Sequence, residues 1–159
     1  MRLVRLAVIG LCAACFLLGA GQARATTVCP WMTQGSADTV LGGDTTATVQ
    51  ASESGEGFCS FTLDQAGTVS MLKVTVHKMA DPPCPAGSAH LKGIGNEAAI
   101  CTQRPSHDEV VERIVSRVRE KHFTVSITIN RKGPHAPEVG RHDEDSLKQI
   151  AEQVAGNLF

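Results

Sequence analysis

Period-two alternation of apolar and polar residues is the feature that most constrains the fold of this 159-residue chain. In residues 123–129 (FTVSITI), every second side chain is Phe, Val or Ile, and the others are Thr or Ser. Residues 69–78 alternate in the same way. Successive side chains of a strand point to opposite faces, so the pattern predicts strands with one buried and one solvated face.

Three further strands are predicted from shorter segments. Residues 45–50 are β-branched and alternate, and residues 58–63 place Cys59, Phe61 and Leu63 on one face. Residues 97–103, which carry Cys101, are interpreted as another strand, and the polar segments between these strands fit loops. Residues 110–118 match both an apolar helix face and a β-branched strand. We interpret them as a strand that forms a hairpin with residues 123–129, and an isolated helix remains the alternative.

A proline-rich stretch and a short polar stretch are expected to be loops. Residues 80–92 (ADPPCPAGSAHLK) contain three prolines around Cys84, and prolines interrupt regular structure. Residues 104–108 connect two predicted strands. We therefore expect no regular structure in either stretch.

Helices are predicted at both ends of the domain. Thr33 is a suitable N-cap for residues 34–41, and Gly42 can end that helix with a positive φ. Asp143 is expected to cap the final helix, which carries one apolar stripe at positions Leu147, Ile150, Ala151, Val154, Ala155 and Leu158. The sequence thus predicts an α+β fold with one mostly antiparallel sheet of about five strands and both helices packed on one face.

The first 25 residues have the composition of a secretory signal peptide. Arg2 and Arg5 precede the uncharged run LAVIGLCAACFLLGAG, and Ala23-Arg24-Ala25 is a small-x-small cleavage triplet. The apolar run is short for a membrane span of about 20 residues. A lipoprotein signal ending at Cys15 is the other alternative, although the apolar run continues beyond that cysteine. We expect cleavage near Ala25, leaving residues 26–159 as a single periplasmic or secreted domain.

Cleavage there would leave a domain with an even number of cysteines. In an exported chain such a set predicts two disulfides. Three pairings are possible for Cys29, Cys59, Cys84 and Cys101, and we favour joining sequence neighbours. A zinc site or a redox motif would require closely spaced pairs such as C-x₂-C, which these residues do not form.

Three short motifs occur in an order that resembles a known class of domain. They are CPWMT at residues 29–33, FCSF at residues 58–61 and GIGNEA at residues 93–98. This set is similar to small exported bacterial domains of unknown function of the DUF3558 type, with an architecture like the Mog1/PsbP α+β fold. The resemblance implies a Cys29–Cys59 bridge and brings no defined activity.

Charge and composition bear on the class of partner. Lys and Arg number 15 and Asp and Glu 16, so the net charge of -1 gives no electrostatic reason to expect nucleic acid as a partner. On the sheet face without helices, we expect a row of side chains that could meet an envelope protein or an anionic surface. These candidate binding residues are Lys73, His77, Arg113, Arg117 and Arg119.

Candidate catalytic and metal-binding residues are few. Ser106-His107-Asp108 has the residue types of a triad, but three consecutive residues cannot converge on one reacting oxygen. His135, His142 and Asp143 share one loop region and are the weak metal candidates. The sequence therefore predicts an exported binding or accessory module without a cofactor. The alternative is a small exported metal-dependent hydrolase that uses the loop histidines.

Overall fold

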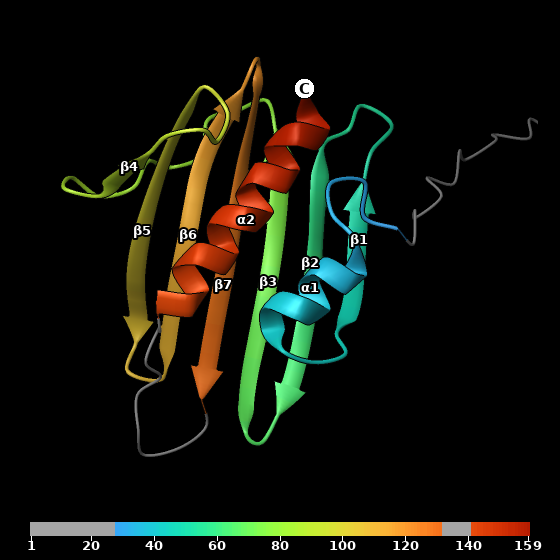
Figure 1. Ribbon diagram of the computed structural model, residues 1–159, viewed down its shortest axis with the longest axis vertical. Helices are drawn as coiled ribbons and strands as arrows, with labels where there is room; N and C mark the ends of the chain where they lie inside the picture. The colour runs from blue at the N-terminus through green and yellow to red at the C-terminus, as the bar shows by residue number, and fades with distance from the viewer. Residues whose placement is uncertain (1–27, 132–140) are drawn as a thin grey trace, which may run out of the picture.

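The fold is an antiparallel sheet with two helices on one face (Figure 1). The structure, a computed structural model, describes residues 28–131 and 141–159, with side chains from residue 144 in the second range. In chain order the elements are α1 (Gln34–Leu41), β1 (Thr46–Ala51), β2 (Gly57–Gln65), β3 (Thr68–His77), β4 (Ala89–Leu91), β5 (Glu97–Ser106), β6 (Glu109–Val118), β7 (Lys121–Arg131) and α2 (Arg141–Leu158).

The strands lie in the order β1-β2-β3-β7-β6-β5-β4, and all neighbours are antiparallel. The first three strands follow one another across the sheet. The chain then passes to the far edge at β4 and returns through β5 and β6 to β7, which pairs with β3. The central pair therefore joins two strands that are distant in the sequence.

The sheet has seven strands rather than the predicted five or so. One difference is β4, which falls within residues 80–92, where the sequence predicts a loop. Its three residues are too few to display alternation, and they form a strand because the outer side of β5 offers backbone partners. A second difference is that β5 continues to Ser106, into residues 104–108, which were predicted to form a loop. Its register with β6 is irregular after Gln103.

Residues 110–118 form a strand and not a helix. They belong to β6, which pairs with β7 through a tight turn from Val118 to Lys121. Burial alternates strictly along β6, with Ile114 fully buried and Arg113 half-buried. The predicted hairpin with residues 123–129 is confirmed.

Both helices pack on the same side of the sheet, as predicted (Figure 1). Helix α2 crosses β6 and β7, and α1 lies over β2 and β3. Leu147, Ala151 and Val154 of α2 are fully buried against a core that includes Phe61 and Phe123. We call this side the covered face and the other side the open face.

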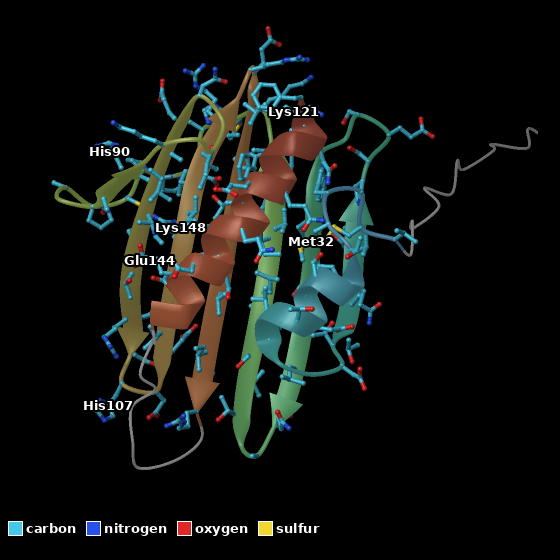
Figure 2. All side chains as sticks on the ribbon, viewed as in Figure 1. Met32, His90, His107, Lys121, Glu144 and Lys148 are labelled. Carbon is cyan, nitrogen blue, oxygen red and sulfur yellow. A yellow bond between two sulfur atoms is a disulfide. The ribbon has the colours of Figure 1, made fainter. Side chains whose placement is uncertain are left out.

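The helix ends agree with the sequence at α1 and differ at α2. Thr33 Oγ1 accepts the Ser36 N–H at 3.1 Å, and Gly42 ends α1 with φ 79°. Helix α2 begins at Arg141, so Asp143 lies in its first turn instead of preceding it. Further along, Lys148 donates to Glu144 at 2.7 Å, and this hydrogen bond raises the pKa of Lys148 (Figure 2).

One disulfide lies on the covered face and joins the start of the described chain to the sheet. Cys29 is bonded to Cys59 in β2, with their Cα atoms 5.8 Å apart. The following residues, Trp31 and Met32, are almost fully buried, and the Trp31 carbonyl accepts a hydrogen bond from Asn157 at 2.8 Å. The bridge thereby fixes the segment before α1 against β2, and Asn157 of α2 holds it from the other side.

Candidate functional site

The open face of the sheet is lined by polar side chains in register. One row crosses six strands and consists of Thr48, Ser60, Lys73, Ser126, Arg113 and Cys101. Most of these positions are half-buried because neighbouring side chains shield one another. Neither helix covers this face, so a partner could reach the sheet from this side.

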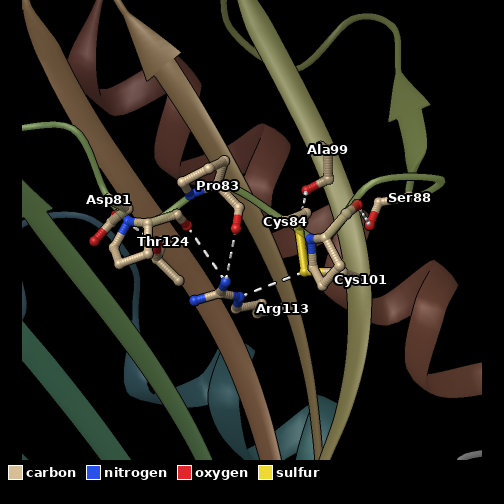
Figure 3. The surroundings of a disulfide bond; sticks show 10 residues. Asp81, Pro83, Cys84, Ser88, Ala99, Cys101, Arg113 and Thr124 are labelled. Atoms are coloured by element: carbon tan, nitrogen blue, oxygen red, sulfur yellow. Dashed lines mark hydrogen bonds between the residues drawn. A yellow bond between two sulfur atoms is a disulfide. The ribbon is translucent and has the colours of Figure 1, made fainter.

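A connecting segment crosses part of the open face. Residues 78–88, here called the strap, link β3 at the sheet centre to β4 at its edge. The chain must therefore pass β7, β6 and β5, and Figure 3 shows it doing so in front of the strands, opposite the helices. Three separate attachments hold it there.

Asp81 makes the first attachment, close to the β3 end of the strap. Its Oδ1 lies 2.9 Å from His77 Nε2, and its Oδ2 accepts a hydrogen bond from the Thr124 hydroxyl. The Asp81 side chain is 18% exposed, so water competes weakly for these two contacts. One carboxylate thus joins β3 and β7 to the strap.

Arg113 makes the second attachment from β6. Its Nη2 donates to the carbonyls of Pro82 and Pro83, at 3.3 Å each, and its Nε donates to Cys101 Sγ at 3.4 Å (Figure 3). The guanidinium is planar and carries several N–H groups, which suits it to hold several acceptors at once. Its function in the fold is to fix the two prolines over the sheet.

The third attachment is the disulfide between Cys84 and Cys101 of β5, whose Cα atoms are 5.7 Å apart. Both disulfides therefore join sequence neighbours, as favoured from the sequence. The two bridges lie on opposite faces, since Cys59 belongs to the covered face and Cys101 to the open face. The first stabilises the core and the second fastens the strap.

A cleft of about 470 Å³ opens between the strap and β4 on one side and β5 and β6 on the other. This volume is within the usual range for small-molecule sites, about 300–1,000 Å³. Much of its floor is apolar, from Ala99, Val115 and the Cys84 end of the disulfide. The polar side chains that line it are His90, Asn96, Glu97, Ser116, Arg117 and His122.

Arg117 is the cationic side chain of the cleft. Its Nη2 lies 2.6 Å from Glu97 Oε1, across the β5–β6 pair, and its Nη1 donates to the Arg119 carbonyl at 3.4 Å. The Arg117 side chain is 38% exposed and that of Glu97 is 74% exposed. Such an exposed ion pair is weak, so an incoming anion can compete with Glu97 for the guanidinium.

The five candidate binding residues do not form one row. Lys73 lies over the Phe58 ring at 4.8 Å, while His77 and Arg113 hold the strap. Arg117 lines the cleft. Arg119 was expected on the same face, but it occupies the β6–β7 turn with φ 55°, and its guanidinium lies over the Phe159 ring beyond α2. The turn reverses the chain there, and so the strand alternation does not extend to Arg119.

The metal candidates lie mostly outside the described part of the chain. His135 is beyond it, and the side chains of His142 and Asp143 are not described. Within residues 28–131 and 144–159, no group of three or more His, Cys, Asp or Glu side chains is placed to hold a metal ion. The metal hypothesis therefore stays a prediction.

Sequence reasoning missed the strap and two cleft histidines. His90 and His122 belong to no sequence motif. His122 lies opposite Arg117 only because of the register between β6 and β7, which the sequence does not specify. The prolines around Cys84 were a usable signal, since a stretch of rigid residues bridged to a strand must lie against the sheet. Which face it crosses depends on the strand order, which the sequence did not reveal.

In comparisons with known proteins, no family model and no curated protein matches this chain. The resemblance to DUF3558-type domains therefore rests on the quoted motifs alone and stays a prediction. Among the described residues, no helix is long and apolar enough to cross a membrane. The two disulfides are compatible with a periplasmic or extracellular protein.

Proposed function

We propose that this chain is an exported, non-catalytic binding module of the α+β class. Its ligand would occupy the cleft beside the strap on the open face. The observation that carries the proposal is the triple fastening of the strap, by Asp81, Arg113 and the Cys84–Cys101 bridge, over a face that the core does not use. A rigid wall over a solvated sheet lowers the entropy cost of binding.

The cleft favours a small acid with an apolar body. Arg117 offers its guanidinium at the rim, and fork-like N–H groups suit a carboxylate or a phosphate. Ala99 and Val115 offer an apolar floor. Lys73, another open-face cation of the candidate set, lies on β3 and would provide a second contact for a larger anionic partner.

The working compartment follows from the cysteines and the leader. Disulfides persist in oxidising compartments, and residues 1–25 have the pattern of a signal peptide. We place the protein in the periplasm or outside the cell after cleavage near Ala25. Its partner there would be an envelope component or a small anionic ligand.

The test is an NMR titration of the ¹⁵N-labelled, disulfide-bonded protein with benzoate, inorganic phosphate and neutral benzamide. We expect benzoate to shift the amides of Ala99, Val115 and His122 in a saturable way. Benzamide should shift them far less, because it lacks the charge that Arg117 recognises. If phosphate shifts the same amides as strongly as benzoate, the cleft recognises any anion. If phosphate shifts them less, the cleft recognises an acid with an apolar body.

Two matched variants decide whether Arg117 is responsible. Arg117→Gln should abolish the benzoate shifts, whereas Arg104→Gln removes the same charge from an exposed position outside the cleft and should preserve them. No saturable shift up to about 20 mM benzoate, a concentration far above useful affinity, would refute the site. Equal responses from both variants would refute the role of Arg117.

The second candidate function, a metal-dependent hydrolase with His135, His142 and Asp143, is separated from the first by metal analysis. Zinc or copper at one equivalent per chain, lost in His142→Ala, would support the hydrolase. Metal-free protein that retains the benzoate response would support the binding module.

A further inference from the structure

Strand β1 forms one edge of the sheet, and its features point to a partner. It pairs with β2 and with no other strand in the described part of the chain. Its sequence, TATVQA, contains no charge and no proline, and its register with β2 has no bulge. Charges, prolines, bulges and very short strands are the usual protection of an exposed edge. This edge has none of them.

The opposite edge is protected. Strand β4 is three residues long and follows the proline-rich strap directly. The Cys84–Cys101 bridge holds the chain just before it. Within residues 28–131, one edge of the sheet is therefore open to another strand and the other is closed.

We propose that β1 pairs antiparallel with β1 of a second copy of this chain, about a two-fold axis at Thr48. In that register Ala47 faces Val49, and Thr46 faces Gln50. Antiparallel partners share a face, so apolar residues meet on the covered face and polar residues on the open face. Because the described strands of each copy leave a single open edge, the assembly closes at two chains instead of extending into a fibre.

The flanking charges and a nearby apolar residue agree with this register. Asp44 would face Ser52 of the second copy, so the acidic residues beside β1 do not oppose each other. Val28 is 73% exposed and precedes Cys29, which is bonded to Cys59, the register partner of Val49. The described part of the chain therefore starts, at Val28, on the covered side, close to β1.

The dimer is expected to be weak and reversible. A single strand pair is smaller than a standard interface, and small interfaces are typical of transient complexes, so we expect a dissociation constant of about 10–100 µM. The joined sheet would keep both open faces on one side, with the clefts near its two ends. The proposal does not depend on what the clefts bind.

Sedimentation equilibrium of the disulfide-bonded protein over this concentration range tests the proposal. We expect a monomer–dimer equilibrium that Thr48→Lys weakens about tenfold, because two like charges would face each other at the axis. Thr102→Lys makes the same change at an exposed strand position of β5 and should leave the equilibrium unchanged. Gln50→Lys, also exposed on β1, provides a second interface variant.

Hydrogen exchange gives an independent readout. At high protein concentration, amides of β1 should gain protection while those of β4 do not. A monomer at all concentrations up to about 1 mM would overturn the proposal, since the expected affinity is well within that range. Equal weakening by Thr48→Lys and Thr102→Lys, or protection confined to other strands, would overturn it as well.

Discussion

Asp81 shows how much a single side chain contributes to the arrangement of the open face. Its two oxygens contact side chains on two neighbouring strands, His77 and Thr124, whose residues are far apart in the sequence. Without Asp81, both would lose a partner in a half-buried setting, and unsatisfied polar groups are costly there. The strap would then depend on Arg113 and the disulfide.

We expect Asp81→Ala to lower the free energy of unfolding by about 1–2 kcal/mol, from the loss of two side-chain hydrogen bonds. Urea denaturation measures this change, and hydrogen exchange should locate the loosening in residues 82–88. Asp64→Ala removes the same group from an exposed position at the end of β2 and is expected to cost less than about 0.5 kcal/mol. Equal effects of the two substitutions would contradict the role of Asp81.

Local residue choices also set the turns. Ala66 and Gly67 join β2 to β3 with φ 49° and 77°, a left-handed pair that suits the twist of a two-residue hairpin. The positive φ at Gly67 can be predicted from the sequence, because glycine adopts it readily. Arg119, with φ 55°, gives no such signal, because an arginine takes this conformation only where the flanking strands impose it.

At the scale of elements, each of the two disulfides attaches a segment to a different face of the sheet. Cys29–Cys59 closes a sequence separation of 30 residues and Cys84–Cys101 one of 17. In the chain-entropy model, both separations give a stabilisation of about 3–4 kcal/mol. Their structural consequences differ, since the first holds a buried segment and the second an exposed strap.

Replacing both Cys84 and Cys101 with Ser should lower the free energy of unfolding by about 3 kcal/mol while the sheet and the core remain intact. The far-UV circular dichroism spectrum would stay the same, and exchange in the strap would become fast. The matched variant replaces Cys29 and Cys59, and it should also expose Trp31 to quenching, because the buried segment loses its tether. If Trp31 became exposed when Cys84 and Cys101 are replaced, the two disulfides would not act on separate parts of the fold.

At the scale of the whole molecule, the proposed export predicts both a cleaved leader and oxidised cysteines. A chain carried across a membrane loses its signal peptide and then oxidises its thiols. When the full-length gene product is exported by a bacterial host, we expect the recovered protein to begin at Thr26. Mass spectrometry without reduction should find peptides joining Cys29 to Cys59 and Cys84 to Cys101, and no free thiol.

Recovery of the uncleaved chain from the cytosol with reduced thiols would contradict the assignment to an exported domain. A peptide linking Cys29 to Cys84 or to Cys101 would contradict the fold as well, because those cysteines lie on opposite faces of the sheet. The control is the same chain without residues 1–25, which should stay in the cytosol.

The sequence by itself determined the local features of this protein. Alternation identified β3 and β7 and their buried faces, and the apolar stripe identified α2, because both patterns repeat within one element. Strand order, the path of the strap and the cleft beside it were decided by tertiary structure. These features depend on pairing between strands that are distant in the sequence, such as β3 with β7. The two-residue period of a strand does not reveal its neighbour, because the period is the same whichever strand lies alongside.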